Sequence, residues 1–248
     1  MRVAACAFDV YGTLLDVETA VRRHAGRLGA SASAVSELWR AKQLEYTWTR
    51  TLMLRYADFR TLTEQALDYA LAKIGVDDTT VGPLLLEAYR DLDAYADTHV
   101  TLAALRDAGV RLAVVSNGTP ELLAEGLAAA DLTPYFDEVI SVAELSVYKP
   151  APAVYELATT RLALPPDRIG FLSANSWDVA GARAAGLHAV WVNRAGNPDE
   201  YGLRGTVPEL DSLTGLPALL LGETGPTAGT AGPPPGGVDL RPRSNPSA

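Results

Sequence analysis

The 248-residue sequence has one cysteine, three histidines and no apolar run long enough to cross a membrane. A single cysteine excludes an intramolecular disulfide and fits a reducing compartment. The lack of a long apolar run argues against a transmembrane helix. The N-terminus places one arginine before a short apolar run, which does not resemble a signal peptide. We therefore expect a cytoplasmic protein.

Positive charge is also in short supply. Lysine and arginine number 21 against 30 acidic residues, so the net charge is −9. This balance argues against nonspecific binding to nucleic acid or to an anionic membrane surface. It does not exclude a small anionic substrate, because the field inside a site depends on local side chains rather than on net charge.

Several common catalytic signatures are missing. The sequence has no Gly-x-Ser-x-Gly elbow and no glycine-rich phosphate loop. His24, His99 and His188 lie far apart and lack zinc-ligand spacing. Cys6 falls inside an apolar run, where a small core residue is expected. The sequence therefore argues against hydrolysis by a serine nucleophile, against a zinc site and against a nucleotide bound by a glycine-rich loop.

The organisation that is present is an alternation of strands and helices. Five continuous apolar runs are typical of strands covered on both faces: Arg2–Phe8, Arg111–Ser116, Glu138–Val142, Arg168–Ser173 and His188–Asn193. Helical patterns lie between them, at Thr98–Gly109, Thr119–Leu132, Pro150–Leu164 and Trp177–Leu187. This alternation predicts an α/β protein with a doubly wound parallel sheet.

Two segments stand outside that alternation. Residues 17–96 are too long for one crossover and rich in helix formers, so we expect an inserted helical cap on a core made of residues 1–16 and 97–221. Residues 222–248 are rich in Pro, Gly, Ser and Thr without periodicity, which predicts a disordered tail.

Polar residues follow four of the predicted strands. Asp9, Tyr11 and Thr13 follow the first; the later groups are Ser116–Asn117–Gly118, Lys149, and Ser173, Asn175, Trp177 and Asp178. Each group alone could be an ordinary turn or a solvated loop. Ligands of open parallel sheets bind at the carboxyl ends of strands, so the convergence of all four predicts a site. Its simplest chemistry is a carboxylate nucleophile, Asp9, paired with Lys149.

These segments also carry a family resemblance. "FDVYGTL" (Phe8–Leu14), "VVSNG" (Val114–Gly118), "VYKPAPAVY" (Val147–Tyr155) and "SANSWD" (Ser173–Asp178) resemble, in order, the four motifs of the haloacid dehalogenase superfamily. "LWRAKQLEYTW" (Leu38–Trp48) and "RYADF" (Arg55–Phe59) resemble the cap of its type II L-2-haloacid dehalogenases. The resemblance covers roughly residues 1–220 and implies a Rossmann-like core with a helical cap.

The resemblance implies a covalent mechanism. Asp9 would displace halide from an L-2-haloalkanoic acid, and water would hydrolyse the resulting ester to the inverted 2-hydroxyacid. Lys149 would orient Asp9 and offset its charge, and Asp178 would position or activate the water. The supporting side chains would be Thr13, Tyr155, Ser173 and Asn175.

The remaining implied roles concern the substrate. Ser116 and backbone N–H groups near Tyr11 and Asn117 would hold its carboxylate. Three residues match halide positions: Arg40, Asn117 and Trp177. On its own, Arg40 would be interpreted as a solvated helix residue. Tyr11, Leu44 and Phe59 are candidates for the alkyl pocket, although helically spaced apolar residues there could equally be cap core.

Tyr11 favours dehalogenation over phosphate transfer. Phosphatases of this superfamily carry a second aspartate there, which protonates the leaving alkoxide, and extra acids near Asp178 that hold Mg²⁺. Halide needs no proton to leave, and a haloacid carries less charge to screen than a phosphate dianion. We therefore expect no metal and no cofactor. The alternatives left open are a metal-dependent phosphatase of the same fold and a non-catalytic binding domain. The family resemblance also suggests a homodimer.

Overall fold

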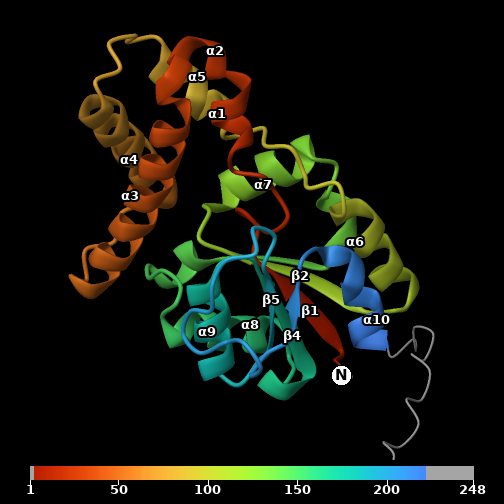
Figure 1. Cartoon of the computed structure of the whole chain (residues 1–248). Helices are drawn as coiled ribbons and strands as arrows, with labels where there is room; N and C mark the ends of the chain where they lie inside the picture. The colour runs from red at the N-terminus through yellow and green to blue at the C-terminus, as the bar shows by residue number, and fades with distance from the viewer. Residues whose placement is uncertain (1–2, 222–248) are drawn as a thin grey trace, which may run out of the picture.

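The structure, a computed structural model, describes residues 3–221 and shows a sheet flanked by helices with a helical arm beside it (Figure 1). The strands are β1 Ala5–Phe8, β2 Arg111–Ser116, β3 Glu138–Ser141, β4 Ile169–Ser173, β5 His188–Val192 and β6 Glu209–Leu210. The α-helices are α1 Thr19–Arg23, α2 Ala25–Leu28, α3 Ala32–Leu52, α4 Phe59–Ile74, α5 Val81–Ala88, α6 Thr98–Asp107, α7 Pro120–Ala129, α8 Pro152–Leu162, α9 Ser176–Ala184 and α10 Leu216–Leu221. Short 3-10 helices lie at Gly29–Ser31, Thr133–Tyr135, Val142–Leu145, Pro166–Arg168 and Leu213–Gly215.

The sheet is parallel throughout, in the order β3-β2-β1-β4-β5-β6. β1 is central, and its Phe8 lies beside Val114 on one neighbour and Leu172 on the other. All four residues of β1 are buried. A strand covered on both faces and both edges needs a continuous apolar run, as its sequence has. The predicted doubly wound α/β fold is confirmed.

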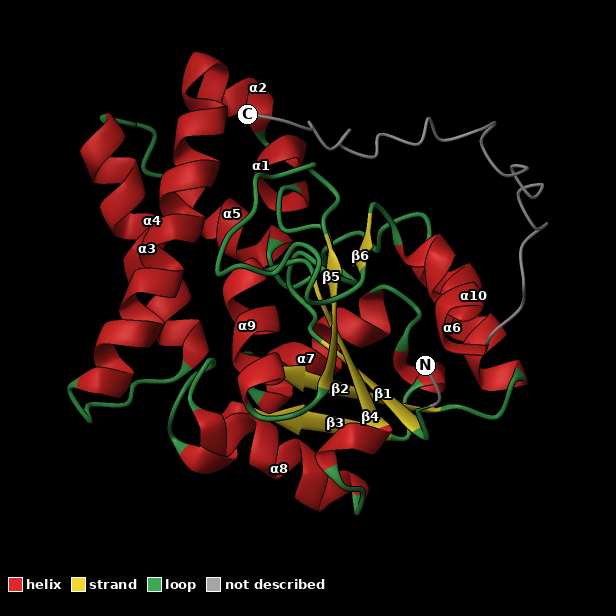
Figure 2. Ribbon diagram, turned by 60° about the horizontal axis from the view of Figure 1, so that its bottom comes forward, coloured by secondary structure: helices red, strands yellow, loops and turns green. Residues whose placement is uncertain are grey.

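Helices cover both faces of the sheet (Figure 2). The chain moves from β1 to β2 and β3 in one direction, with α6 and α7 on one face. It then crosses back to β4 and β5, with α8 and α9 on the other face. Right-handed crossovers require this change of face when the direction of winding reverses.

The boundaries agree with the sequence pattern to within a few residues. All five predicted strands are present, but β1 begins at Ala5 rather than Arg2, and Arg2 lies outside the described residues. The sixth strand was not predicted. It has two residues, Glu209 and Leu210, which pair with Trp191 and Val192, and two residues are too short to show a period. The predicted tail, residues 222–248, also lies outside the described part.

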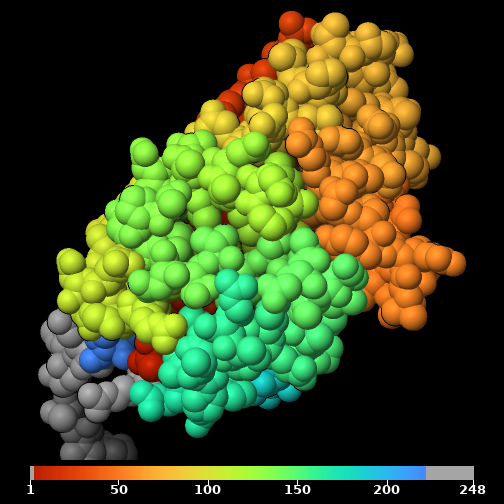
Figure 3. Space-filling model, turned by 180° about the vertical axis from the view of Figure 1, so that it is seen from behind, coloured from red at the N-terminus to blue at the C-terminus, as the bar shows by residue number. Residues whose placement is uncertain are grey.

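The segment between β1 and α6 contains helices α1 to α5, which we call the helical insert (residues 17–96). It projects as an orange and amber lobe beside the rest of the molecule (Figure 3). Its two longest helices, α3 and α4, pack together, and Trp39 of α3 donates its indole N–H to the Thr63 carbonyl of α4 at 2.9 Å. The Asp58 side chain caps α4 by accepting from the Thr61 N–H, and Gly75 ends it with a left-handed φ of 79°.

The two chain connections to the insert run side by side. Asp16 donates its N–H to the Asp93 carbonyl at 2.8 Å, and Tyr95 donates to the Leu14 carbonyl at 3.0 Å. Because Leu14 lies only five residues beyond Asp9, this pairing fixes the insert close to the end of β1. Among the described helices, none combines the length and hydrophobicity that a bilayer span requires.

Candidate active site

The candidate site lies where the winding of the sheet reverses. β1 and β4 are neighbours whose following connections leave in opposite directions, so a crevice opens at their carboxyl ends. Asp9 is the first residue after β1, and Ser173 is the last residue of β4. Asp9 is only 5% exposed. A buried carboxylate is costly unless it is paired and hydrogen-bonded, so its partners define the site.

The two oxygens of Asp9 have different surroundings. Oδ2 accepts hydrogen bonds from Thr13 Oγ1 at 2.9 Å, Asn175 Nδ2 at 2.8 Å and Ser173 Oγ at 3.4 Å. Oδ1 accepts from Lys149 Nζ at 3.0 Å. Oδ2 is therefore crowded by donors, while Oδ1 keeps more of its lone-pair density for a reacting atom.

Lys149 joins two buried carboxylates. Its side chain is fully buried, and Nζ lies 2.8 Å from Asp178 Oδ2 as well as 3.0 Å from Asp9 Oδ1. Burial tends to lower the pKa of this ammonium, but the charges of Asp178 and Asp9 outweigh it and raise the pKa. The lysine therefore stays charged between the two acids.

Asp178 is the most deeply buried acid of the cluster. Its exposed fraction is 0%, and its Oδ1 accepts from the Tyr155 hydroxyl at 2.7 Å. Burial, reinforced by the nearby charge of Asp9 and opposed by Lys149, raises the pKa of Asp178 to about 6. Burial also raises the pKa of Tyr155 well above its ordinary range, so this phenol is a donor and not an anion. A carboxylate with a pKa near 6 is ionised at neutral pH and more basic than an ordinary aspartate.

The turn after β1 fixes the loop that follows Asp9. Thr13 Oγ1 accepts from the Ala174 N–H at 2.9 Å, so its own proton points to Asp9. The Thr13 carbonyl accepts from Arg194 Nη2 at 3.0 Å. Gly12, with a φ of 91°, makes the tight turn between Asp9 and Thr13.

Arg40 reaches the site from the helical insert. Its Nη2 lies 3.3 Å from the Tyr11 carbonyl and 3.5 Å from Asn175 Oδ1, and Asn175 in turn donates to Asp9. Its Nη1 donates to Gln43 Oε1 at 2.7 Å. The sequence alone could not choose between a solvated Arg40 and one at the site, and the structure places it at the site.

One face of α3 points toward the same region. Arg40, Leu44 and Trp48 are spaced four residues apart, which puts them in one row, and all three are half-buried. Trp48 meets Trp177 edge to face, with ring centroids 5.5 Å apart. Leu44 therefore lies on the face of α3 that carries Arg40, between two residues that contact the core.

Tyr11 is packed as an aromatic wall. Its ring stacks on Tyr89 at 5.4 Å between centroids and lies tilted against Phe59 at 5.5 Å. Burial is the main cause that raises the pKa of Tyr11 well above its ordinary range. The residue two positions after Asp9 is therefore a neutral, apolar surface rather than a proton donor poised near neutrality.

The loop after β2 is tied to the lysine. Ser116 Oγ accepts from the Gly118 N–H at 3.2 Å, and Asn117 Oδ1 accepts from the Lys149 N–H at 3.2 Å. Because the carbonyl oxygen of Asn117 is used in this way, its NH₂ group is the part that remains for a ligand.

Most of the predicted site residues therefore come together around Asp9, from four strand ends and from α3. Sequence reasoning did not single out several residues that contact them, among them Gln43, Tyr89 and Arg194. Gln43 lies three residues after Arg40 on a helix, so its spacing was a usable signal. Tyr89 and Arg194 meet the site only through tertiary packing. Across residues 3–221, no three His, Cys, Asp or Glu side chains are grouped as metal ligands would be.

The comparisons with known proteins agree with this fold. A family model described as haloacid dehalogenase-like hydrolase matches residues 3–186. The chain therefore belongs to the haloacid dehalogenase-like hydrolases, and the predicted superfamily is confirmed.

Within that family, the likeness is to 2-haloacid dehalogenases. The chain is 49% identical to (S)-2-haloacid dehalogenase 1 of Pseudomonas sp. strain CBS-3 over 88% of its own length and 97% of that protein. A solved dehalogenase structure matches with a TM-score of 0.86 and 45% identity, over 88% of this chain and 97% of that one. The L-2-haloacid dehalogenase of Xanthobacter autotrophicus, solved with chloropropionic acid covalently bound, matches with a TM-score of 0.79 and 33% identity, over 90% and 100%.

Proposed function

We propose that this protein hydrolyses L-2-haloalkanoic acids to D-2-hydroxyalkanoic acids and halide through an ester on Asp9. The observation that carries the proposal is the buried Asp9–Lys149–Asp178 cluster. It offers one carboxylate whose Oδ1 accepts a hydrogen bond only from Lys149 and a second carboxylate of raised pKa. Similarity to an (S)-2-haloacid dehalogenase, and to an L-2-haloacid dehalogenase solved with chloropropionic acid covalently bound, supports the same reaction.

The first step is a displacement at carbon. Asp9 Oδ1 forms a bond to Cα of the substrate, and the carbon–halogen bond breaks with its electron pair leaving on the halide. Attack from the side opposite the halogen inverts the configuration. Oδ2 stays held by Thr13, Asn175 and Ser173, which fixes the carboxylate plane during attack.

The second step is ester hydrolysis. Water adds to the carbonyl carbon of the Asp9 ester, and Asp178 takes a proton from that water. The bond between this carbon and the alkyl oxygen then breaks, and that oxygen takes up the proton held by Asp178 as the hydroxyacid leaves. Asp9 loses the remaining proton to solvent and is a carboxylate again. The substrate Cα is not attacked again, so the inversion is kept. The raised pKa of Asp178 suits it to this base role.

The substrate is held by groups around the cluster. Its carboxylate would be bound by the Ser116 hydroxyl and backbone N–H groups near Tyr11 and Asn117. The departing halide would meet the Arg40 guanidinium, the Asn117 NH₂ group and the Trp177 ring. Tyr11, Leu44 and Phe59 would line the alkyl pocket, and the packing of Tyr11 on Phe59 supports an apolar wall there.

Tyr11 also explains the choice of leaving group. An alkoxide needs a proton from a nearby acid, whereas a halide leaves as a stable anion. Burial raises the pKa of Tyr11 well above its ordinary range, so at neutral pH it is a much weaker proton donor than an aspartic acid at this position would be. The geometry therefore favours carbon–halogen cleavage over the phosphatase alternative.

Halide release from L-2-chloropropionate tests the proposal directly. We expect release from the L but not the D enantiomer, insensitivity to EDTA, and no release by Asp9→Asn. A single turnover in H₂¹⁸O should place the label in Asp9. The proposal is wrong if the protein instead hydrolyses phosphoesters in an EDTA-sensitive way and releases no halide, or if label enters the hydroxyacid first.

Three further features are proposed. Residues 17–96 act as a cap on a core of residues 1–16 and 97–221, supported by the paired connections at Asp16 and Tyr95. The protein works in the cytoplasm, consistent with its single buried cysteine. It forms a homodimer, which light scattering across a concentration series would test.

A further inference from the structure

A buried amide lies directly behind Arg40. Gln43 is 1% exposed, and its Oε1 accepts from Arg40 Nη1 at 2.7 Å. Its Nε2 donates to Thr63 Oγ1 at 2.7 Å and to the Tyr89 hydroxyl at 3.1 Å. Because a guanidinium can only donate, the amide oxygen must face Arg40. The NH₂ group must then find two acceptors, and it does.

The acceptors of Gln43 are themselves held in place. Thr63 donates its hydroxyl proton to the Phe59 carbonyl at 2.7 Å, so its oxygen is free to accept from Gln43. Tyr89 stacks on Tyr11 and packs against Trp39, with centroids 5.4 and 5.3 Å apart. The network therefore joins α3, α4 and the residue after α5, and it fixes the orientation of Gln43 from within the helical insert.

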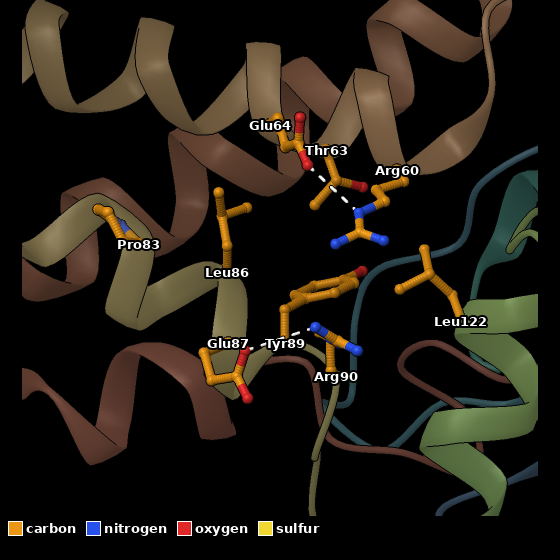
Figure 4. A pocket seen from close by; sticks show the side chains of 9 residues that line it. All are labelled: Arg60, Thr63, Glu64, Pro83, Leu86, Glu87, Tyr89, Arg90 and Leu122. Carbon is orange, nitrogen blue, oxygen red and sulfur yellow. Dashed lines mark hydrogen bonds and ion pairs between the residues drawn. The ribbon is translucent and has the colours of Figure 1, made fainter.

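The other side of this network faces a surface hollow. A cavity of about 200 Å³ is lined by Thr63 and Tyr89 together with Arg60, Arg90 and neighbouring residues. Figure 4 shows the Tyr89 ring lying between Arg60 and Arg90. Thr63 and Tyr89 thus separate Arg40 from solvent in this direction, and a cavity of about 20 Å³ lies beside Arg40, Gln43 and Tyr89.

We propose that Gln43 is a positioning residue that holds the Arg40 guanidinium over Asp9 for departure of the halide. An arginine side chain has many rotamers, and its anchoring at Nη1 leaves Nη2 directed at Tyr11 and Asn175. This inference rests on the proposed dehalogenation and deepens it, because it adds an element that acts through Arg40 without touching substrate.

The first test is Gln43→Met, which keeps the length and burial of the side chain but cannot accept from Arg40. Loss of one hydrogen bond to a charged group predicts a fall of about tenfold to a hundredfold in kcat on L-2-chloropropionate, with little change in KM. The fall should be smaller on L-2-bromopropionate, because bromide leaves more readily. Thr63→Val keeps the contact to Arg40 but removes the anchor, so we expect an intermediate loss with the same halogen dependence.

The control is Thr47→Val on the same helix. Thr47 is also fully buried, and its hydroxyl donates to the Leu44 carbonyl within α3. We expect it to leave the chloride-to-bromide rate ratio unchanged, whatever its effect on thermal stability. A general loosening of α3 would instead change the chloride-to-bromide rate ratio of Gln43→Met and of Thr47→Val by the same amount.

The decisive experiment is a double-mutant cycle. If Gln43 acts through Arg40, Gln43→Met should cost nothing further in an Arg40→Ala background. An equal loss in both backgrounds, or an unchanged halogen ratio in Gln43→Met, overturns the positioning role alone. A wild-type protein that releases no halide overturns the proposed function as well, so the two failures are distinguishable.

Discussion

Replacing Asp178 with asparagine should separate stability from activity. Asp9, Lys149 and Asp178 form a buried group with one excess negative charge. The substitution would remove that excess at nearly constant volume. With the new amide oxygen turned toward Lys149, the NH₂ group can donate to the Tyr155 oxygen. The Tyr155 proton can then go to the backbone carbonyl of residue 178, which already lies 3.2 Å away. The amide oxygen and one of its two N–H groups therefore have partners where the carboxylate oxygens had them.

The pKa of Asp178 sets the size of the effect. A pKa raised from 3.8 to about 6 means that the folded state favours the protonated acid by about 3 kcal/mol. The stability that this group contributes is present below pH 4 and is lost as pH rises through about 6. Asparagine does not ionise, so the Asp178→Asn variant does not lose this stability as pH rises. Relative to wild type, it should therefore gain up to about 3 kcal/mol at pH 8, and the gain should shrink toward pH 4.

Urea unfolding of both proteins between pH 4 and pH 8 measures this difference, with turnover assayed in parallel. We expect Asp178→Asn to release little or no hydroxyacid while it unfolds at higher urea near pH 8. Asp68→Asn, at an exposed position of α4, is the matched control and should show a flat difference. The reasoning would be refuted if the difference in unfolding free energy between Asp178→Asn and wild type did not depend on pH. It would also be refuted if the variant were less stable than wild type at pH 8.

Three other predictions follow from the same cluster. The kcat of wild type should fall at acid pH as Asp178 becomes protonated, with a midpoint at or below about 6 because the ester removes the charge of Asp9. A pH–rate profile would show this, and a flat profile down to pH 4 excludes Asp178 as the base. Asp9→Asn should form no ester detectable by mass spectrometry. An ester found on any other residue would show that this residue is the nucleophile. Lys149→Met should destabilise the protein by about 3–5 kcal/mol in urea unfolding, since it leaves two buried carboxylates unpaired. Adding Asp178→Asn to it should restore part of that loss.

The core of the fold could be predicted because its signals are local. Buried parallel strands must be apolar throughout, so β2 was located at both ends from its own residues. β6 could not be found in this way, because two residues that pair only with the end of β5 carry no periodicity. Polar residues follow four of the predicted strands, and the structure brings them together because parallel strands end at one edge of the sheet.

The part of the site built by the helical insert was harder to predict. Arg40 lies 31 residues from Asp9 in sequence, and its pattern alone is that of an ordinary helix residue. Only the packing of α3 against α4, and of both beside the end of β1, brings it to Tyr11 and Asn175. Local spacing does not determine such packing, so the resemblance to a known cap supplied that expectation.

The arrangement of cations matches the movement of charge in the proposed reaction. Before attack, the negative charge of Asp9 lies beside Lys149. When the ester forms, Asp9 becomes neutral and the charge moves to the halide, near Arg40. Lys149 is then left with Asp178 alone, which favours the ionised form of that acid when it must accept a proton from water. A single buried cation could not serve both positions, because Arg40 reaches the site from the insert and Lys149 from the core. In the proposed reaction the two cations therefore have distinct tasks: Lys149 would hold the charge before displacement and Arg40 would receive it afterwards.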